Sequence, residues 1–156
     1  MVMRHTLCVS IIALLFFILG SARAQEPVQY AIQKPGKVKR GEQFEIAVKF
    51  SILPGWYIYA PTGLNEAQGM IETNVVFDLP DGITRKGKIQ MPEPHFLKGH
   101  EVYAGDSVAM TQPLKVSNAL NPGRYIIKGK ITWQTCSEEA CLMPAREEVA
   151  ILIEVK

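Results

Sequence analysis

The chain has 156 residues, of which 47% are hydrophobic and 21% are charged, with 17 Lys and Arg against 15 Asp and Glu. Two of the basic residues and none of the acidic ones fall in the first 24 positions, so the rest of the chain is electrically balanced. A balanced chain without a Lys/Arg cluster lacks the electrostatic signature of proteins that bind nucleic acid or anionic lipid. We therefore expect no nucleic-acid partner.

Residues 1–24 are predicted to be a signal peptide. Arg4 precedes an apolar run over 6–20, and the chain then reaches Ala24 through the small-x-small pattern that signal peptidase cuts. The apolar run is short for a membrane span, and an N-terminal anchor that is not cleaved is the alternative. We expect cleavage after Ala24 and export, which leaves residues 25–156 as one domain.

Most of the remaining chain shows apolar residues alternating with polar ones. The clearest case is Phe44, Ile46, Val48 and Phe50, each separated by one residue, which predicts a half-buried strand. The same period, or a short apolar run between turn residues, predicts further strands at 56–59, 75–79, 108–114, 124–136 and 149–155. No convincing amphipathic helix is present.

Residues 91–99 (MPEPHFLKG) break this pattern, because they hold two prolines and no alternation. They predict a long connection that cannot pair in the middle of a sheet. The spacing of strands and turns predicts seven to nine strands after the signal peptide. That number favours an all-β, immunoglobulin-like β-sandwich, with a small barrel as the alternative.

Two cysteines remain after the signal peptide, because Cys8 lies within it. Cys136 and Cys141 are five positions apart, and an even number of cysteines in an exported chain predicts a disulfide. The buried face of the preceding strand falls on odd numbers from Tyr125 to Trp133, so we expect Cys136 near the surface. The two cysteines would flank the turn of the last hairpin.

The purpose of such a disulfide has two interpretations. A bridge across so small a ring stabilises by roughly 2 kcal/mol, against about 4 kcal/mol for one spanning most of a sandwich. An exposed bridge in a small ring is also the kind that exchanges readily. Glu138 and Glu139 between the cysteines disfavour a thiolate, an effect that Arg146 offsets in part. We therefore expect a pair that reacts mainly when a partner brings its own thiolate or disulfide to it.

Metal binding is a further alternative. Cys136, Cys141, His95 and His100 are four plausible zinc ligands, but their spacing matches no familiar zinc site. Copper(I) suits the soft sulfurs better, because two methionines add thioethers to the set, although scattered methionines are more often core residues. These two methionines are Met91 and Met143. We expect no cofactor.

Three segments resemble one known family. Residues 133–144 (WQTCSEEACLMP) are similar to the active hairpin of the N-terminal periplasmic domain of DsbD, the thiol:disulfide interchange protein. Residues 55–59 (GWYIY) resemble the Gly-aromatic-Tyr-x-Tyr segment of that family, and residues 96–103 (FLKGHEVY) resemble its cap loop. The resemblance spans nearly all of residues 25–156.

The resemblance implies an immunoglobulin-like fold and a periplasmic location. Its cysteine pair would carry electrons from a membrane-embedded thiol reductase to periplasmic thioredoxin-fold proteins, with the chain acting as a monomer. Cys141 would form mixed disulfides and Cys136 would resolve them. Phe96 would cap the pair, and the side chains lining the site would be Tyr57, Tyr59 and Tyr103.

This sequence departs from the family pattern in three places. The cysteine spacing is the shorter of those found, Met143 replaces the first of two prolines, and Pro94-His95 stand where acidic residues can precede the cap aromatic. His95 would place a titrating imidazole beside the cap. The membrane and thioredoxin-like domains of DsbD do not follow, so we expect a separate protein as electron donor. The alternative functions are an adaptor or chaperone module with a structural disulfide, and a Cu(I)-handling protein.

Overall fold

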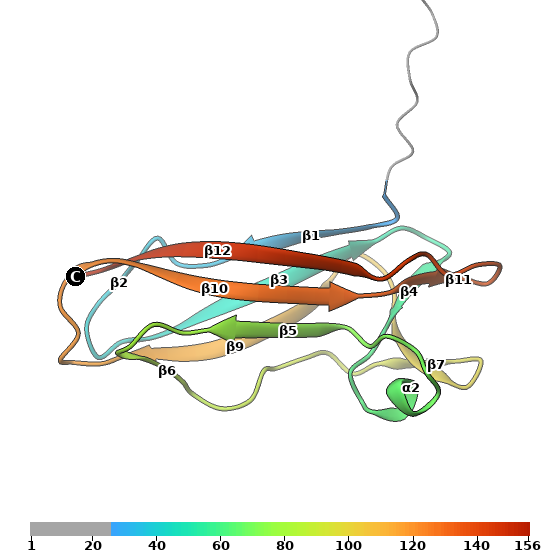
Figure 1. Ribbon diagram of the computed structural model, residues 1–156, viewed down its shortest axis with the longest axis horizontal. Helices are drawn as coiled ribbons and strands as arrows, with labels where there is room; N and C mark the ends of the chain where they lie inside the picture. Colours follow the sequence, from blue (N-terminus) through green and yellow to red (C-terminus); the bar gives the residue numbers. More distant parts are fainter. Residues whose placement is uncertain (1–25) are drawn as a thin grey trace, which may run out of the picture.

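The computed structural model describes residues 26–156 as twelve strands and one short helix (Figure 1). The predicted signal peptide and Cys8 lie outside these described residues. The elements are β1 (Val28–Gln33), β2 (Lys37–Val38), β3 (Gln43–Ile52), β4 (Trp56–Tyr59), α2 (Leu64–Ala67), β5 (Asn74–Asp78), β6 (Ile83–Arg85), β7 (His95–Leu97), β8 (His100–Tyr103), β9 (Val108–Val116), β10 (Gly123–Trp133), β11 (Thr135–Ser137) and β12 (Ala145–Val155).

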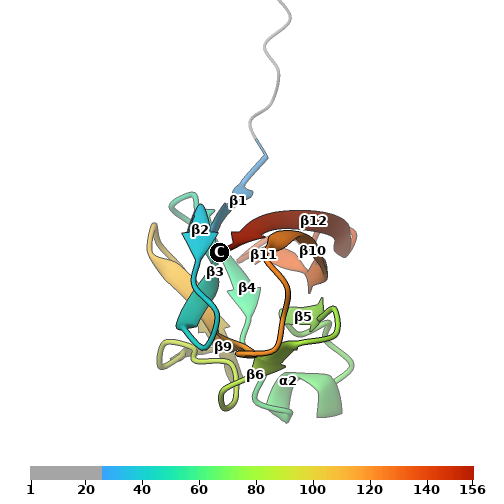
Figure 2. The same cartoon turned by 90° about the vertical axis from the view of Figure 1, so that its left-hand side faces the viewer.

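Two four-stranded sheets form the sandwich. One has the order β1-β3-β9-β6 and the other β2-β12-β10-β5 (Figure 2). A third sheet, β11-β4-β8-β7, lies at one end of the molecule, and the C-terminus lies at the opposite end (Figure 1). The sheets stay open at their edge strands, so the predicted immunoglobulin-like sandwich is confirmed and the barrel alternative is wrong.

The core follows from the period of two. In β3 every second residue from Phe44 to Ile52 is buried, and β9, β10 and β12 alternate in the same way along most of their length. These inward faces meet between the two sheets. Trp133 packs there edge-on against Tyr30 and Phe50, with ring centroids 5.7 and 5.8 Å apart. The alternation in the sequence therefore predicted which residues form the core.

The structure has more elements than the seven to nine strands expected. One strand outside the predicted set, β1, has six residues. The others have two to four residues, too few to show a periodic pattern. Residues 91–99 were expected to be a connection, yet their last part forms β7, which pairs only with β8. An edge position suits a segment that follows two prolines. Within residues 26–156 no helix has the length and apolar character needed to span a membrane.

Asn65, in the short helix α2, links β4 to β8 of the third sheet through hydrogen bonds. Its side chain is fully buried, and its amide group donates hydrogen bonds to the carbonyls of Ala60 (2.9 Å) and Glu101 (2.8 Å). Its side-chain oxygen accepts the backbone N–H of Glu101 at 3.2 Å. This single side chain therefore joins the end of β4 to the middle of β8.

Asn65→Ala should lower the free energy of unfolding by about 1–3 kcal/mol, because it leaves buried backbone groups without partners. Asn65→Asp should cost more, since a carboxylate would face two carbonyl oxygens that now accept hydrogen bonds. Urea denaturation followed by tryptophan fluorescence measures both changes. Equal stability of the Asp variant and the original chain would contradict this role.

Candidate active site: an asymmetric disulfide

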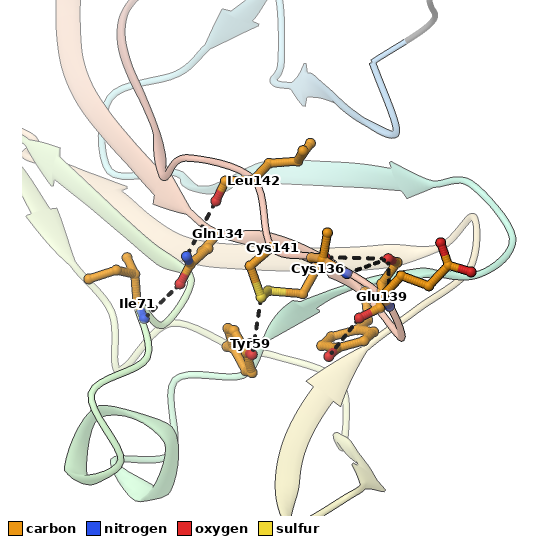
Figure 3. The surroundings of a disulfide bond; sticks show 10 residues. Tyr59, Ile71, Gln134, Cys136, Glu139, Cys141 and Leu142 are labelled. Atoms are coloured by element: carbon orange, nitrogen blue, oxygen red, sulfur yellow. Dashed lines mark hydrogen bonds between the residues drawn. A yellow bond between two sulfur atoms is a disulfide. The ribbon is translucent and has the colours of Figure 1, made fainter.

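The disulfide joins two neighbouring chain segments in one hairpin. Cys136 lies in β11 and Cys141 lies opposite, with their Cα atoms 4.0 Å apart and their sulfur atoms bonded (Figure 3). Hydrogen bonds flank the pair on both sides, from Ser137 N–H to the Ala140 carbonyl and from Leu142 N–H to the Thr135 carbonyl, each 2.8 Å. This pattern marks a non-hydrogen-bonded antiparallel pair, in which opposite Cα atoms come closest. The predicted disulfide is confirmed.

The two cysteines differ in exposure. Cys136 is 0% exposed, whereas Cys141 is exposed. The expectation that Cys136 lies near the surface is therefore wrong. The alternation of β10 ends at Trp133, Gln134 belongs to no strand, and β11 begins a new sheet in which Thr135 and Cys136 are both buried. Thr135 pairs with Ile58 on the face that meets the sandwich, so Cys136 lies on the other face, as the parity assumed. Cys136 is buried because that face is covered by an apolar cluster of its own.

The register of the third sheet separates its two faces. Tyr57 pairs with Cys136, and Tyr59 pairs with Val102, so these side chains share one face. Cys136, Tyr59 and Val102 accordingly form a small buried cluster apart from the main core. The other face holds Ile58 and packs against the sandwich. The disulfide therefore has its own apolar support.

Two of the tyrosines named from the resemblance, Tyr57 and Tyr59, contact the disulfide hairpin. The Tyr59 hydroxyl lies 3.8 Å from Cys141 Sγ, and the Tyr57 hydroxyl donates to the Ser137 carbonyl at 3.4 Å. Their rings pack edge-on with centroids 5.7 Å apart. Burial, together with the neighbouring Tyr57, raises the pKa of Tyr59 from 10.0 to about 12. Tyr59 thus keeps its proton at neutral pH and can donate a hydrogen bond to Cys141.

Phe96 lies elsewhere than the resemblance implied. It pairs with Glu101 in β8, so it belongs to the face opposite the disulfide, and its side chain is 72% exposed. Leu97, its neighbour, belongs to the disulfide face. Both Leu97 and Met70 pack against the cluster. In this structure these two residues cover the cluster and Phe96 does not, because alternate residues of a strand point to opposite faces. A capping role for Phe96 stays a prediction.

Tyr103 also differs from the expectation that it lines the site. It is buried in the main core, and its hydroxyl donates to the Pro92 carbonyl at 3.1 Å. Burial raises its pKa, with a further contribution from Glu101. Its register partner Ile58 explains this position, since both belong to the face that meets the sandwich. Tyr103 therefore connects the 92–103 segment to the core and not to the sulfurs.

Gln134 is a site residue that the sequence analysis did not single out. Its side-chain oxygen accepts the Ile71 N–H at 3.3 Å, and its amide group donates to the Leu142 carbonyl at 3.3 Å (Figure 3). It thus joins the loop after α2 to the segment that follows Cys141. Its place in the family-like segment 133–144, two residues before Cys136, was the available signal.

His100, which the sequence suggested only as a possible zinc ligand, lies beside the site. Its ring packs edge-on against Tyr59, with centroids 5.4 Å apart, and its Nδ1 atom is buried without a hydrogen-bond partner. His95 is exposed in β7. No group of three or more His, Cys, Asp or Glu side chains within residues 26–156 is arranged to hold a metal ion.

The charges around the hairpin are partly compensated. Glu138 forms an ion pair with Lys98, 3.5 Å apart, across to the turn between β7 and β8. Lys98 and Gly99 both adopt positive φ angles, 50° and 87°, as a two-residue type I′ turn requires.

The backbone N–H groups at the start of α2 donate to the Glu72 carboxylate, which accepts from Gly63, Asn65 and Glu66. In the part of the chain that the structure describes, the N-terminus of the one helix is therefore occupied by a carboxylate of the chain itself.

Comparison with models of known protein families identifies the family of this chain. The family model for the thiol:disulfide interchange protein DsbD, N-terminal, matches residues 25–153. The chain belongs to this family. The family is that of a thiol:disulfide interchange protein, and this DsbD N-terminal family member has a disulfide between Cys136 and Cys141.

Two solved structures are similar to this member of the family. The DsbD N-terminal domain of Neisseria meningitidis in the reduced form is 21% identical, over 78% of this chain and 83% of that chain, with a TM-score of 0.40. The N-terminal periplasmic domain of ScsB from Proteus mirabilis is 14% identical, over 81% of this chain and 47% of that chain, with a TM-score of 0.47. The comparison with curated proteins gave no match.

Tyr59→Phe should lower the reduction potential of the pair. The hydroxyl stabilises a Cys141 thiolate, which exists only in the reduced form, so its removal disfavours reduction by about 1 kcal/mol, or about 20 mV. Equilibration with glutathione buffers measures the shift. Tyr57→Phe is the matched control, because its hydroxyl binds a carbonyl and not a sulfur. An unchanged potential in Tyr59→Phe would show that this hydrogen bond has no redox role.

Proposed function

We propose that this chain is a periplasmic electron relay that uses Cys141 to form mixed disulfides and Cys136 to resolve them. Residues 1–24 would direct export, and residues 25–156 would form the mature redox domain. A separate membrane-embedded reductase would supply electrons, and periplasmic thioredoxin-fold proteins would receive them. Membership in the DsbD N-terminal family supports these partners.

The difference in exposure carries the assignment of roles. An attacking thiolate must approach one sulfur in line with the bond that breaks, and only Cys141 is exposed in the oxidised pair. Cys136 is buried and pairs with Tyr57 on one side and Cys141 on the other, so a partner has no direct access to its sulfur. Cys136 is thus suited to be the leaving group and later the internal nucleophile.

In the proposed cycle every disulfide bond that forms replaces one that breaks. A thiolate of the reductase attacks Cys141 Sγ, the Cys136–Cys141 bond breaks, and Cys136 leaves as a thiolate. The second thiolate of the reductase then displaces Cys141, which leaves the chain as a dithiol and the reductase as a disulfide. Cys141 next attacks the disulfide of an acceptor, and Cys136 displaces the acceptor to restore the starting bond. Two electrons pass through the chain, with no cofactor required.

Cys136→Ala should accumulate a mixed disulfide with a thioredoxin-fold partner, because Cys141 can attack but no internal thiol remains to resolve the product. Cys141→Ala should accumulate at least about tenfold less, since the remaining thiol is buried. The partner is a thioredoxin that keeps one reactive cysteine, activated with a thiopyridyl group that leaves as pyridinethione. Non-reducing gel electrophoresis after mixing and acid quenching measures both variants. Trapping by the Cys141→Ala variant alone would reverse the roles.

The reduction potential separates this proposal from a structural disulfide. A bridge that only fastens the hairpin should have a potential below about −300 mV, whereas a relay needs a higher one. We expect the higher value for the original chain. A value below that limit would favour the adaptor interpretation.

A further inference from the structure

We propose that Leu142 and Met143 form a preformed apolar contact surface for a folded thiol-exchange partner, one whose reactive cysteine is surrounded by an uncharged apolar surface. This inference rests on the proposed function and adds to it the recognition of the partner. Leu142 is 42% exposed and Met143 is 88% exposed, and both directly follow the exposed Cys141. Met143 is therefore not part of the core.

The geometry of exchange requires that a partner contact these residues. A mixed disulfide brings the two sulfur atoms to about 2.05 Å, so the partner's surface must cover whatever adjoins Cys141 on its open side. The buried Cys136 and the Tyr59 ring close the other side. Figure 3 shows Leu142 and Tyr59 on opposite sides of Cys141. A partner that reaches the sulfur therefore meets Leu142 and its neighbour.

The contact surface is held in place before a partner arrives. The N–H of Leu142 donates to the Thr135 carbonyl at 2.8 Å, and its carbonyl accepts from Gln134 at 3.3 Å. Because both backbone groups are bound, the backbone of Leu142 needs little ordering when a partner docks. Met143 has an unbranched, polarisable side chain, which suits contact with more than one partner surface.

The charges nearby favour an uncharged partner surface over an acidic one. Glu138 and Glu139 are exposed on the turn that precedes Cys141, and Glu139 has no ion-pair partner within residues 26–156. Lys98 compensates Glu138 alone. An acidic partner would meet repulsion on this side, whereas an apolar one would bury Met143 without opposing charge.

The test compares one protein disulfide with one small disulfide. Reduced chain would be mixed with a thioredoxin whose single reactive cysteine carries a thiopyridyl group, and separately with uncharged dipyridyl disulfide. In each case the Cys141 thiolate displaces pyridinethione, whose absorbance gives the second-order rate constant. The ratio of the two rate constants reports docking apart from thiol reactivity.

Met143→Gln and Leu142→Gln change polarity with little change in size or charge. Each should lower the ratio by about fivefold to tenfold, as expected for loss of a well-placed apolar contact. Leu152→Gln is the matched control, since Leu152 is 45% exposed and lies in β12 opposite Ile126, towards the far end of the sandwich. This control should keep the original ratio.

The results that would contradict the contact surface differ from those that would contradict the proposed function. If the original chain exchanges with both disulfides and the two site variants keep its ratio, the contact surface is overturned and the proposed function stands. Exchange with dipyridyl disulfide alone overturns the surface as a site for thioredoxin-fold partners. Reaction with neither disulfide overturns the proposed function, and the contact surface with it.

Discussion

The site depends on the passage of the chain from one sheet to another at Gln134. β10 is a central strand of the sandwich, and β11, one residue later, belongs to the third sheet. Both faces of the third sheet are covered, one by the main core and the other by the Cys136 cluster, so the consecutive residues Thr135 and Cys136 are both buried in β11. The Gln134 amide stabilises the break by binding both Ile71 and Leu142. The move into a sheet with two covered faces is therefore what buries Cys136.

The third sheet separates the redox pair from the core of the sandwich. One face of this sheet packs with Ile58 into the main core, while the other holds the disulfide with Tyr59 and Val102. The disulfide can therefore open and close against its own small cluster, without a void forming between the main sheets. Asn65 and the ion pair of Lys98 with Glu138 join the neighbouring loops to this arrangement.

The hairpin combines a buried sulfur, an exposed sulfur and an exposed apolar segment within the eight residues from Cys136 to Met143. Tyr59 supplies a neutral donor beside Cys141, since its raised pKa of about 12 keeps it protonated. The acidic turn gives the opposite influence, because negative charge disfavours a thiolate. A pair with these opposed influences suits a relay, which must both accept and release electrons.

The sequence by itself determined the sandwich, the disulfide and the family, because the period of two, the cysteine count and the 133–144 motif are local features. It also identified Tyr57 and Tyr59 as neighbours of the site. Only the tertiary structure decided that Cys136 is buried, that Phe96 faces away and that Tyr103 belongs to the main core. These outcomes depend on strand register and on a change of sheet, which arise from pairing between segments up to eighty residues apart and leave no local pattern in the chain.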